Sequence, residues 1–210
     1  MPETKLIVLG GGGHASVVCD VARAAGFRDV LVCDPNVRTG TLCGFPCAVE
    51  DEDVLLERNA ADADFVVAIG HRIARARLLE RCRRAKARLA VIVHPSAVIS
   101  PFARLEDGVV VMPRAVVNAG ALIGRGSIVN TGAVVEHDCR VGEAVHVAPG
   151  SVICGGVEIG DRVDLGAGSV IIPGRRVGAD AIVGAGSVIV RDVASGTTVF
   201  GNPARPKPAP

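Results

Sequence analysis

One short charged segment of this chain carries the residue types of proton-transfer chemistry. Glu136, His137 and Asp138 interrupt a stretch that is otherwise rich in glycine, alanine and valine, and a second histidine, His146, follows nine residues later. A neutral imidazole whose pKa lies near working pH accepts a proton efficiently, and a neighbouring carboxylate orients the ring and stabilises the imidazolium. His137 is therefore a candidate proton acceptor, supported by Asp138 or Glu136. The alternative for His137 is a solvated residue on the protein surface.

The charged segment lies within a repeat that has a period of six residues. Every sixth position from Val93 to Ile189 is Val, Ile or Leu, and the position four residues after each is mostly small, with Arg175 as the exception. Neither a helix nor an alternating strand has this period, whereas a parallel β-helix uses one short strand and one corner per six residues. The pattern therefore predicts triangular coils of 18 residues that stack about 4.8 Å apart.

The amino-terminal part of the chain predicts a strand, a glycine turn, a helix and a second strand. Lys5–Leu9 is a short apolar run, residues 16–25 have a helical pattern that ends at Gly26, and residues 30–34 form a second apolar run that ends on Asp34. The glycine turn over residues 10–15 lies at the helix N-terminus, where backbone amides bind phosphate.

The glycine turn is compatible with two kinds of ligand and with a purely structural role. Gly10, Gly12 and Ala15 satisfy the GxGxxA form of the dinucleotide fingerprint, and Asp34 has the spacing of a ribose ligand. About 92 residues are too few for the usual six-stranded dinucleotide fold. We therefore expect one nucleotide or sugar nucleotide, bound by backbone amides between Gly12 and Ala15. In the structural alternative, the glycines only make a tight turn.

Five further segments complete the amino-terminal part. The helix expected over residues 72–88 carries eight basic residues, which we interpret as a solvated face; contact with phosphate or a partner is the alternative. Its apolar stripe consists of Ile73, Ala76, Leu79 and Cys82. The other expected segments are a loop over residues 40–46, an acidic helix over 51–60, a strand over 65–71 and a last strand over 89–93.

Three pairs of residues are expected to meet in one crevice. Ligands of an open α/β sheet bind at the carboxyl ends of its strands. The pairs at these ends are Gly13-His14, Asp34-Pro35 and Gly70-His71.

Composition excludes several classes of protein. A net charge of +1, no Trp or Tyr and only five Phe argue against nucleic-acid binding by charge or by base stacking. No apolar run reaches membrane-spanning length, and the start of the sequence lacks a signal-peptide layout, so we expect no membrane insertion. Seven cysteines without repeated CxxC pairs suit reduced thiols and a cytoplasmic location.

The order of these motifs resembles one group of enzymes along essentially the whole chain. A glycine turn followed by His-Ala, a strand that ends in Asp, an Ala-Ile-Gly strand and His-Pro-Ser-Ala before the hexapeptides is similar to bacterial acetyltransferases that act on nucleotide-linked amino sugars. The segment from Asn130 to Cys139 is the most specific part of the resemblance. The group includes UDP-N-acetylbacillosamine-pathway and GDP-perosamine N-acetyltransferases.

The resemblance implies a fold class and an assembly. We expect an α/β Rossmann-like half domain over residues 1–92 that binds a sugar nucleotide, and an all-β left-handed parallel β-helix over 93–200 that carries acetyltransferase activity. Residues 201–210 are expected to form an extended tail that leaves the prism of the β-helix. The left hand comes from the resemblance, because a period of six does not specify it. Such enzymes form homotrimers with acetyl-CoA in the grooves between subunits, and they use no metal.

The resemblance also implies roles for individual residues. His137 matches the general base, and Asp138 matches the acid that raises its basicity. His146 matches a residue that contacts the thioester region of acetyl-CoA, and main-chain groups at Ala167 and Ala185 match the pantetheine groove. The positions that match the sugar-nucleotide site are Gly12, Gly13, His14, Ala15, Asp34, Pro35, Gly70 and His71, where some relatives carry Asn in place of His71.

The expected reaction is transfer of the acetyl group of acetyl-CoA to an amino group, favoured at the 4-position, of a UDP- or GDP-linked amino-dideoxy sugar. An O-acetyltransferase acting on sialic acid or another sugar is the first alternative. A zinc enzyme like the γ-carbonic anhydrases is less favoured, because His94, His137 and His146 do not reproduce its ligand spacing. A non-catalytic nucleotide sensor is the remaining alternative.

Overall fold

The computed structural model describes residues 4–36 and 40–207, and the chain divides into two compact units, Met1–Pro95 and Ser96–Pro210. The first unit is organised on one sheet with the strand order β3-β4-β2-β1-β5-β6. All neighbouring strands are parallel except β3, which is antiparallel to β4. The elements of this unit are β1 (Lys5–Leu9), α1 (Gly13–Ala24), β2 (Val30–Cys33), β3 (Thr41–Leu42), β4 (Phe45–Ala48), α2 (Glu52–Asn59), β5 (Ala63–Val67), α3 (Arg72–Arg84), β6 (Arg88–Leu89) and β7 (Ile92–Val93).

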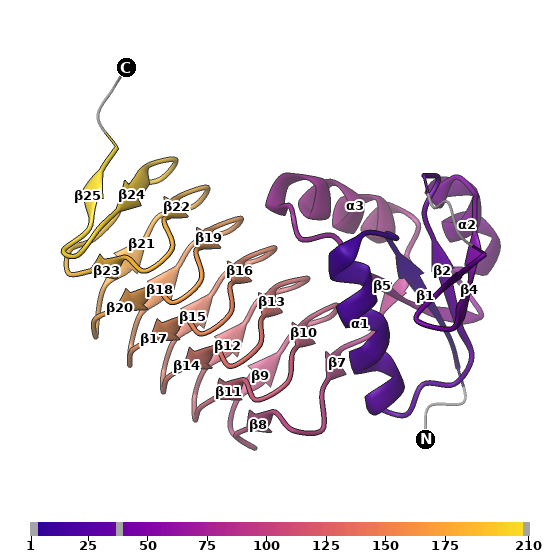
Figure 1. The fold of residues 1–210 in the computed structure, drawn as a ribbon, viewed down its shortest axis with the longest axis horizontal. Helices are drawn as coiled ribbons and strands as arrows, with labels where there is room; N and C mark the ends of the chain where they lie inside the picture. Colours follow the sequence, from indigo (N-terminus) through magenta and orange to yellow (C-terminus); the bar gives the residue numbers. More distant parts are fainter. Residues whose placement is uncertain (1–3, 37–39, 208–210) are drawn as a thin grey trace. The chain divides into compact units, whose positions relative to one another are not determined.

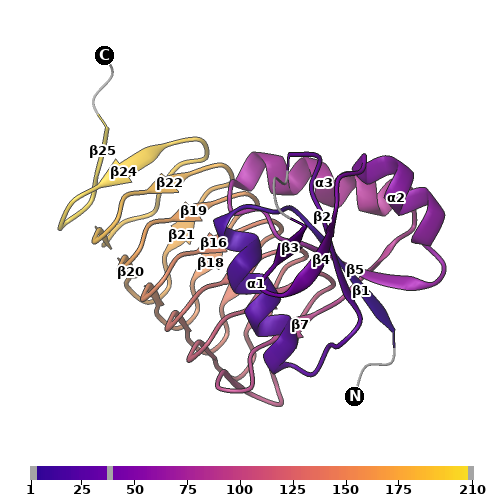
Figure 2. The same cartoon turned by 45° about the vertical axis from the view of Figure 1, so that its right-hand side comes forward.

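The central strand β1 is buried on both faces. Leu6, Ile7, Val8 and Leu9 have no exposed surface, as expected of a continuous apolar run in a parallel sheet covered by helices. Helix α1 lies on one face of the sheet and helices α2 and α3 lie on the other (Figures 1 and 2). This arrangement follows from right-handed crossovers that run in opposite directions from β1 and β5.

Several predicted boundaries in this unit are wrong for local reasons. Helix α1 begins at Gly13, three residues earlier than predicted, because Gly12 is already its extended N-cap. The expected loop over residues 40–46 is a hairpin, since Cys43 and Gly44 both take the positive φ of a two-residue turn. The strand expected over 65–71 ends at Val67. The sheet contains six strands despite the short length of this unit, because two of them, β3 and β6, consist of only two residues each.

The basic helix also differs from its prediction. Helix α3 ends at Arg84, because Lys86 adopts a positive φ of 54° and the chain then joins the sheet as β6. Residues 89–93 contribute to two separate short strands instead of one. The buried face consists of Arg75, Leu78, Leu79 and Cys82, so it is shifted from the predicted stripe and includes one of the basic residues that were expected to be solvated.

The second unit is a left-handed parallel β-helix with three walls, as the period of six and the resemblance predicted. Paired residues such as Val116 and Val134 lie 18 positions apart, which confirms the predicted coil. The strands of the three walls stack in parallel along the unit (Figure 1). Wall 1 contains β8 (Val98–Ile99), β11 (Val116–Val117), β14 (Val134–Val135), β17 (Val152–Ile153), β20 (Val170–Ile171) and β23 (Val188–Ile189). Wall 2 contains β9 (Arg104–Leu105), β12 (Leu122–Ile123), β15 (Arg140–Val141), β18 (Glu158–Ile159) and β21 (Arg176–Val177). Wall 3 of this unit contains β10 (Val110–Val111), β13 (Ile128–Val129), β16 (His146–Val147), β19 (Asp164–Leu165), β22 (Ile182–Val183) and β24 (Thr198–Phe200).

The second residue of most strands points into the prism, and each corner between residues 108 and 186 contains one residue in the left-handed region. Every sixth residue from Gly108 to Gly186 has a positive φ. Glycine adopts this conformation without steric strain, and Asp tolerates it better than most other residues. The corners therefore explain both the phase of the glycines and the position of Asp138 within the repeat.

The carboxyl-terminal segment, which the structure describes as far as residue 207, folds back onto the prism. The prediction of an extended tail that leaves the prism is wrong for residues 201–207, because β25 (Arg205–Pro206) pairs antiparallel with β24. Ala204 N donates to Val188 O at 2.8 Å, which holds the returning segment on the last coil. None of the helices in the described ranges has the length and apolarity needed to cross a bilayer.

Truncation of an inward side chain should destabilise the prism far more than truncation of its outward neighbour. Ile123 is fully buried, so Ile123→Ala should lower the free energy of unfolding by about 2–5 kcal/mol through lost burial and a residual cavity. Leu122 precedes it on wall 2 and points outward, so Leu122→Ala should cost less than about 1 kcal/mol. Chemical denaturation followed by circular dichroism measures both. Equal losses would contradict the inward assignment of the period-six residues.

Candidate active site

The corner between walls 1 and 2 carries an exposed histidine–carboxylate pair. His137 lies two residues after the end of β14, and its Nδ1 lies 2.9 Å from Oδ2 of Asp138. The two side chains are 63% and 75% exposed, so both are accessible to a ligand. Because Nδ1 is engaged by the carboxylate, Nε2 is the ring nitrogen presented for proton transfer.

The carboxylate raises the basicity of the imidazole. The pKa of His137 lies above its ordinary value, chiefly because the hydrogen bond to Asp138 outweighs the opposing effect of partial desolvation, and the charges of Asp138 and Glu136 raise it further by smaller amounts. Glu136 Oε2 accepts a hydrogen bond from the backbone N–H of His137 at 3.3 Å, whereas the ring Nδ1 is bonded to Asp138. Asp138 is therefore the carboxylate that orients the imidazole.

The repeat itself places Asp138 beside the histidine. Asp138 occupies the left-handed corner position, with φ of 59°, where most coils carry glycine. Its backbone N–H donates to Ala119 O of the preceding coil at 3.0 Å. A carboxylate at this position meets the imidazole without distortion of the corner, because aspartate adopts the left-handed conformation more readily than bulkier residues.

Two glycines in the adjacent coils leave room for the pair. A Cβ on Gly155 would lie 2.5 Å from His137 Nε2, and a Cβ on Gly120 would lie 2.5 Å from Asp138 Oδ1. Gly155 has no positive φ, so steric room for the imidazole is the reason for glycine there. These positions were not identified from the sequence. The signal was present, since each lies one coil of 18 residues from its neighbour.

His146 lies on wall 3 and is held at both ring nitrogens. Its Nδ1 is 3.3 Å from Asp164 Oδ1, and its Nε2 is 3.0 Å from Asn130 Nδ2. The Asn130 carbonyl oxygen accepts from Thr131 N at 2.8 Å, which directs the amide NH₂ toward the histidine. Nε2 of His146 therefore accepts a hydrogen bond, and Nδ1 carries the proton that faces Asp164.

A single prism does not bring all the predicted acetyl-CoA residues together. Ala167 and Ala185 are exposed at the corner between walls 3 and 1, one coil apart. The two coils are joined beside these alanines, where Gly186 N donates to Ala167 O at 2.9 Å. His137 lies at the other end of wall 1, at the corner between walls 1 and 2. The two groups of residues are thus separated by the width of wall 1 in one protomer.

In the first unit, Asp34 organises the glycine turn. Its Oδ2 accepts from Gly11 N at 2.7 Å, and its Oδ1 accepts from Asn36 N at 2.7 Å. A Cβ on Gly11 would lie 2.9 Å from Asp34 Cβ, so the close approach requires glycine. Asp34 therefore has a structural role in addition to any contact with a ligand. Pro35 follows it and is exposed.

The turn ends at the N-terminus of α1, which is an anion-binding geometry. Gly12 is the N-cap, and Gly13, His14 and Ala15 form the first turn, whose amides have no acceptors within the helix. The Ala15 side chain is fully buried, so only its backbone can contribute to a site. A Cβ on Gly70 would lie 3.9 Å from His14 Cβ, which places the predicted Gly13-His14 and Gly70-His71 pairs beside each other.

The loop at Gly70 is held by two side chains with structural roles. Arg75 is fully buried and donates from Nη1 to Ile69 O at 2.9 Å and to Gly70 O at 2.5 Å. His71 is the N-cap of α3, and its Nδ1 accepts from Ala74 N at 3.4 Å. The buried arginine was missed from the sequence, because one cation in a basic helix gives no sign that it points inward.

Neither unit contains a recognisable metal centre within the residues that the structure describes. No group of three or more His, Cys, Asp or Glu side chains is arranged there to hold a metal ion. All seven cysteines are free thiols.

Two family matches agree with the division of the chain into two kinds of fold. Residues 5–82 match the PglD N-terminal domain, and residues 138–173 match the bacterial transferase hexapeptide family (six repeats). No curated protein sequence gives a match.

Several solved structures match along nearly the whole chain. A histidine-to-asparagine mutant of perosamine N-acetyltransferase from Caulobacter crescentus, in complex with CoA and GDP-perosamine, is 41% identical; the match covers 99% of each chain, with a TM-score of 0.92. The acetyltransferase domain of PglB from Neisseria gonorrhoeae, in complex with acetyl coenzyme A, is 38% identical over 98% of this chain and 100% of that chain, with a TM-score of 0.92. WeeI from Acinetobacter baumannii is 26% identical over 97% and 100% of the two chains, with a TM-score of 0.87.

Replacement of Asp138 should lower the pKa of His137. The hydrogen bond to Asp138 is the main cause of the raised value, so Asp138→Asn should move the pKa back toward the ordinary histidine value near 6.5. Glu136→Gln is the matched control and should lower it less, since Glu136 acts on the ring only through its charge. Titration of the His137 ring resonances by NMR measures both. A larger shift in the Glu136 variant would assign the supporting role to the other carboxylate.

Proposed function

Because this chain belongs to the family of hexapeptide-repeat sugar acetyltransferases with a PglD-type N-terminal domain, we propose that it transfers the acetyl group of acetyl-CoA to the amino group of a nucleotide-linked 4-amino-4,6-dideoxy sugar. GDP-perosamine is the favoured acceptor. The observation that carries this proposal is the 41% identity over 99% of the chain to an enzyme bound to CoA and GDP-perosamine. The exposed His137–Asp138 pair supplies the proton acceptor that the reaction requires.

The proposed reaction is direct attack of the sugar amine on the thioester. A nitrogen–carbon bond forms, the tetrahedral intermediate breaks its carbon–sulfur bond, and CoA leaves as the thiolate. Nε2 of His137 accepts the proton that the nitrogen loses, while Asp138 stabilises the resulting imidazolium. Cys139, which follows Asp138, is fully buried with a pKa raised by burial, and the direct attack invokes no acyl-enzyme.

The first unit provides the proposed nucleotide site. The amides at the start of α1 and the positive end of its dipole suit the diphosphate of a sugar nucleotide, with Gly12, Gly13, His14 and Ala15 as the contacting residues. We assign further contacts to Asp34, Pro35, Gly70 and His71. The contact of Asp34 would use carboxylate lone pairs that do not accept from Gly11 N or Asn36 N. The contact of His71 would use Nε2, because Nδ1 accepts from Ala74 N.

The proposed acetyl-CoA site uses residues from two corners of the prism, which requires a second copy of the chain. His146, Ala167 and Ala185 lie on or beside one end of wall 3, whereas His137 lies at the far end of wall 1. In a trimer of parallel prisms, wall 1 of each subunit would face a common axis. The corner between walls 1 and 2 of one subunit would then lie against the corner between walls 3 and 1 of its neighbour. We therefore propose a homotrimer with acetyl-CoA bound in each groove between subunits.

The outward side chains of wall 1 favour this arrangement. They form a column of six valines in hydrogen-bonded register, at positions 98, 116, 134, 152, 170 and 188. The outward column of wall 2 is instead mainly charged, at positions 104, 122, 140, 158 and 176. An apolar wall beside a charged one marks the surface that a partner would cover. The free thiols further support a reducing compartment, and we propose the cytoplasm as the location.

The wild-type enzyme should release thiol from acetyl-CoA in the presence of GDP-perosamine, and His137→Ala should lower kcat by at least about 10²-fold. The KM for acetyl-CoA should change little, because the imidazole acts on the transition state. A coupled thiol assay with mass spectrometry of the sugar product measures both. UDP- and CMP-linked amino sugars serve as comparison acceptors. Absence of acetyl transfer to any nucleotide amino sugar would reject the proposed function, and near-normal kcat in His137→Ala would reject this histidine as the base.

Charge on the valine column should separate the subunits. Val134→Glu combined with Val152→Glu should convert a trimer into a monomer of 21.5 kDa at about 10 μM, because two carboxylates per subunit would face an apolar interface. Leu122→Glu on wall 2 is the matched control and should leave the assembly intact. Size-exclusion chromatography with light scattering gives the masses. A wild-type monomer, or dissociation by the control alone, would contradict the arrangement.

A further inference from the structure

A hollow of about 610 Å³ lies in the first unit, between the end of α1 and the hairpin of β3 and β4. Its apolar lining consists mainly of Phe27, Val30 and Phe45, which are all buried. Arg23 and Arg28 line the same hollow. Neither the proposed nucleotide site nor the proposed acetyl transfer uses any of these residues.

The hairpin holds the guanidinium group of Arg23. Its Nη2 donates to Cys43 O, and the group lies over the Phe45 ring, 4.4 Å from the ring centroid. A Cβ on Gly44 would lie 3.3 Å from the same Nη2, so the glycine of the turn also leaves room for the guanidinium group. Arg23 therefore lines the hollow in a defined orientation.

Main-chain oxygens at the end of α1 hold the guanidinium group of Arg28. Its Nη1 donates to Arg23 O at 3.0 Å and to Phe27 O at 3.3 Å. A cation is favoured at this end of a helix, because the last carbonyl groups carry partial negative charge. Both guanidinium groups are therefore anchored on main-chain oxygens before any ligand binds.

Within the described part of the chain, the charges of Arg23 and Arg28 have no carboxylate partner. Each side chain uses only one Nη group as a donor there. Other arginines of the unit instead pair with acids, namely Arg58, Arg81, Arg83, Arg84 and Arg88. The donors that Arg23 and Arg28 leave over suit the oxygens of a phosphate group, which arginine binds through paired N–H groups.

Asp29 adds a second kind of polar group to the hollow. It is exposed, follows Arg28 directly and lines the same hollow. A carboxylate repels a bare phosphate ion, but it accepts hydrogen bonds from hydroxyl groups. Two arginines beside one acid therefore favour a phosphate ester that also carries hydroxyl groups, and the volume is in the range of small-molecule pockets.

The hollow and the proposed nucleotide site lie at opposite ends of β2. Val30, the first residue of the strand, lines the hollow, whereas Asp34, which follows the strand, accepts from Gly11 N in the glycine turn. Four residues of extended chain separate Val30 from Asp34 by about 13 Å. A phosphate group in the hollow is therefore distinct from a diphosphate at the start of α1.

We propose that this hollow binds a sugar phosphate, with Arg23 and Arg28 contacting the phosphate and Asp29 accepting hydrogen bonds from the sugar hydroxyls. The site goes beyond the proposed acetyl transfer and stands independently of it.

Calorimetric titration of the full-length protein with glucose 6-phosphate and with inorganic phosphate tests the assignment. The wild type should bind glucose 6-phosphate more tightly than inorganic phosphate. Arg23→Ala combined with Arg28→Ala should weaken glucose 6-phosphate binding by at least about 10-fold, the loss expected from removal of charge-assisted hydrogen bonds. Asp29→Ala should narrow the difference between the two probes, because it removes both the acceptor for hydroxyls and the charge that repels phosphate.

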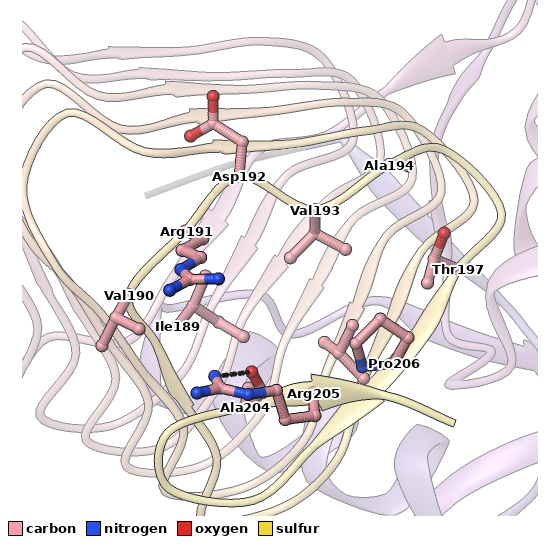
Figure 3. Close-up of a pocket in the computed structure, with 11 residues that line it drawn as sticks. Ile189, Val190, Arg191, Asp192, Val193, Ala194, Thr197, Ala204, Arg205 and Pro206 are labelled. Carbon is pink, nitrogen blue, oxygen red and sulfur yellow. Dashed lines mark hydrogen bonds between the residues drawn. The ribbon is translucent and has the colours of Figure 1, made fainter. Parts of the chain in front are cut away.

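Two arginines outside the hollow provide matched controls. Arg58→Ala removes an exposed arginine of the same unit that pairs with Glu50. Arg205→Ala removes an arginine that lines a different pocket, at the carboxyl-terminal end of the prism, and donates to Ala204 O at 2.9 Å (Figure 3). Both controls should bind glucose 6-phosphate as the wild type does. Loss of binding in a control, with binding retained in the double variant, would place the ligand elsewhere and overturn the proposal.

A milder variant keeps the test decisive if the double variant does not fold, which circular dichroism shows. Arg28→Gln retains an N–H donor for Arg23 O but removes the charge, so it should weaken glucose 6-phosphate binding by about 10-fold. Unchanged affinity in the arginine variants, equal affinity of the wild type for the two probes, or no binding of glucose 6-phosphate to the wild type would each overturn the proposal.

Discussion

Hydrogen bonding between successive coils is the constraint on which the second unit depends. Each short strand pairs with the strand 18 residues later, so the side chains of residues one coil apart are held near one another whatever their type. His146 faces Asp164 for this reason, and Gly155 lies against His137. The backbone carries the positional information, and side chains at the corners and on the outer walls vary without loss of the fold.

The same constraint explains how an exposed pair can have a fixed geometry. Surface ion pairs are normally weak, because two flexible side chains lose conformational freedom on meeting. Here Asp138 is held by a corner conformation that recurs every six residues and lies against Gly120, and His137 lies against Gly155 of the next coil. The prism thus limits the rotational freedom of the pair before any ligand binds, which favours proton transfer by a preorganised group.

The first unit uses hydrogen bonds in a different way. Asp34 joins the end of β2 to the glycine turn after β1, and Arg75 joins α3 to the loop after β5. These two side chains hold the loops that follow neighbouring strands, since loops at a sheet edge have no ladder of their own to fix them. The charges at the proposed nucleotide site are therefore partly structural.

The sequence by itself determined the β-helix, its 18-residue coil, the βαβ start and the identity of the histidine–carboxylate pair. Each of these depends on short-range periodicity or on neighbours in the chain, such as the hexad that ends at Ile189 or the adjacency of His137 and Asp138. The tertiary structure alone decided which carboxylate orients His137, that Arg75 is buried, that Cys43 and Gly44 form a hairpin turn and that residues 205–206 return to the prism. These features depend on side-chain rotamers and on pairing between distant segments. A local pattern of residue types does not specify either, because several orientations and pairings satisfy the same pattern until the packed neighbours select one.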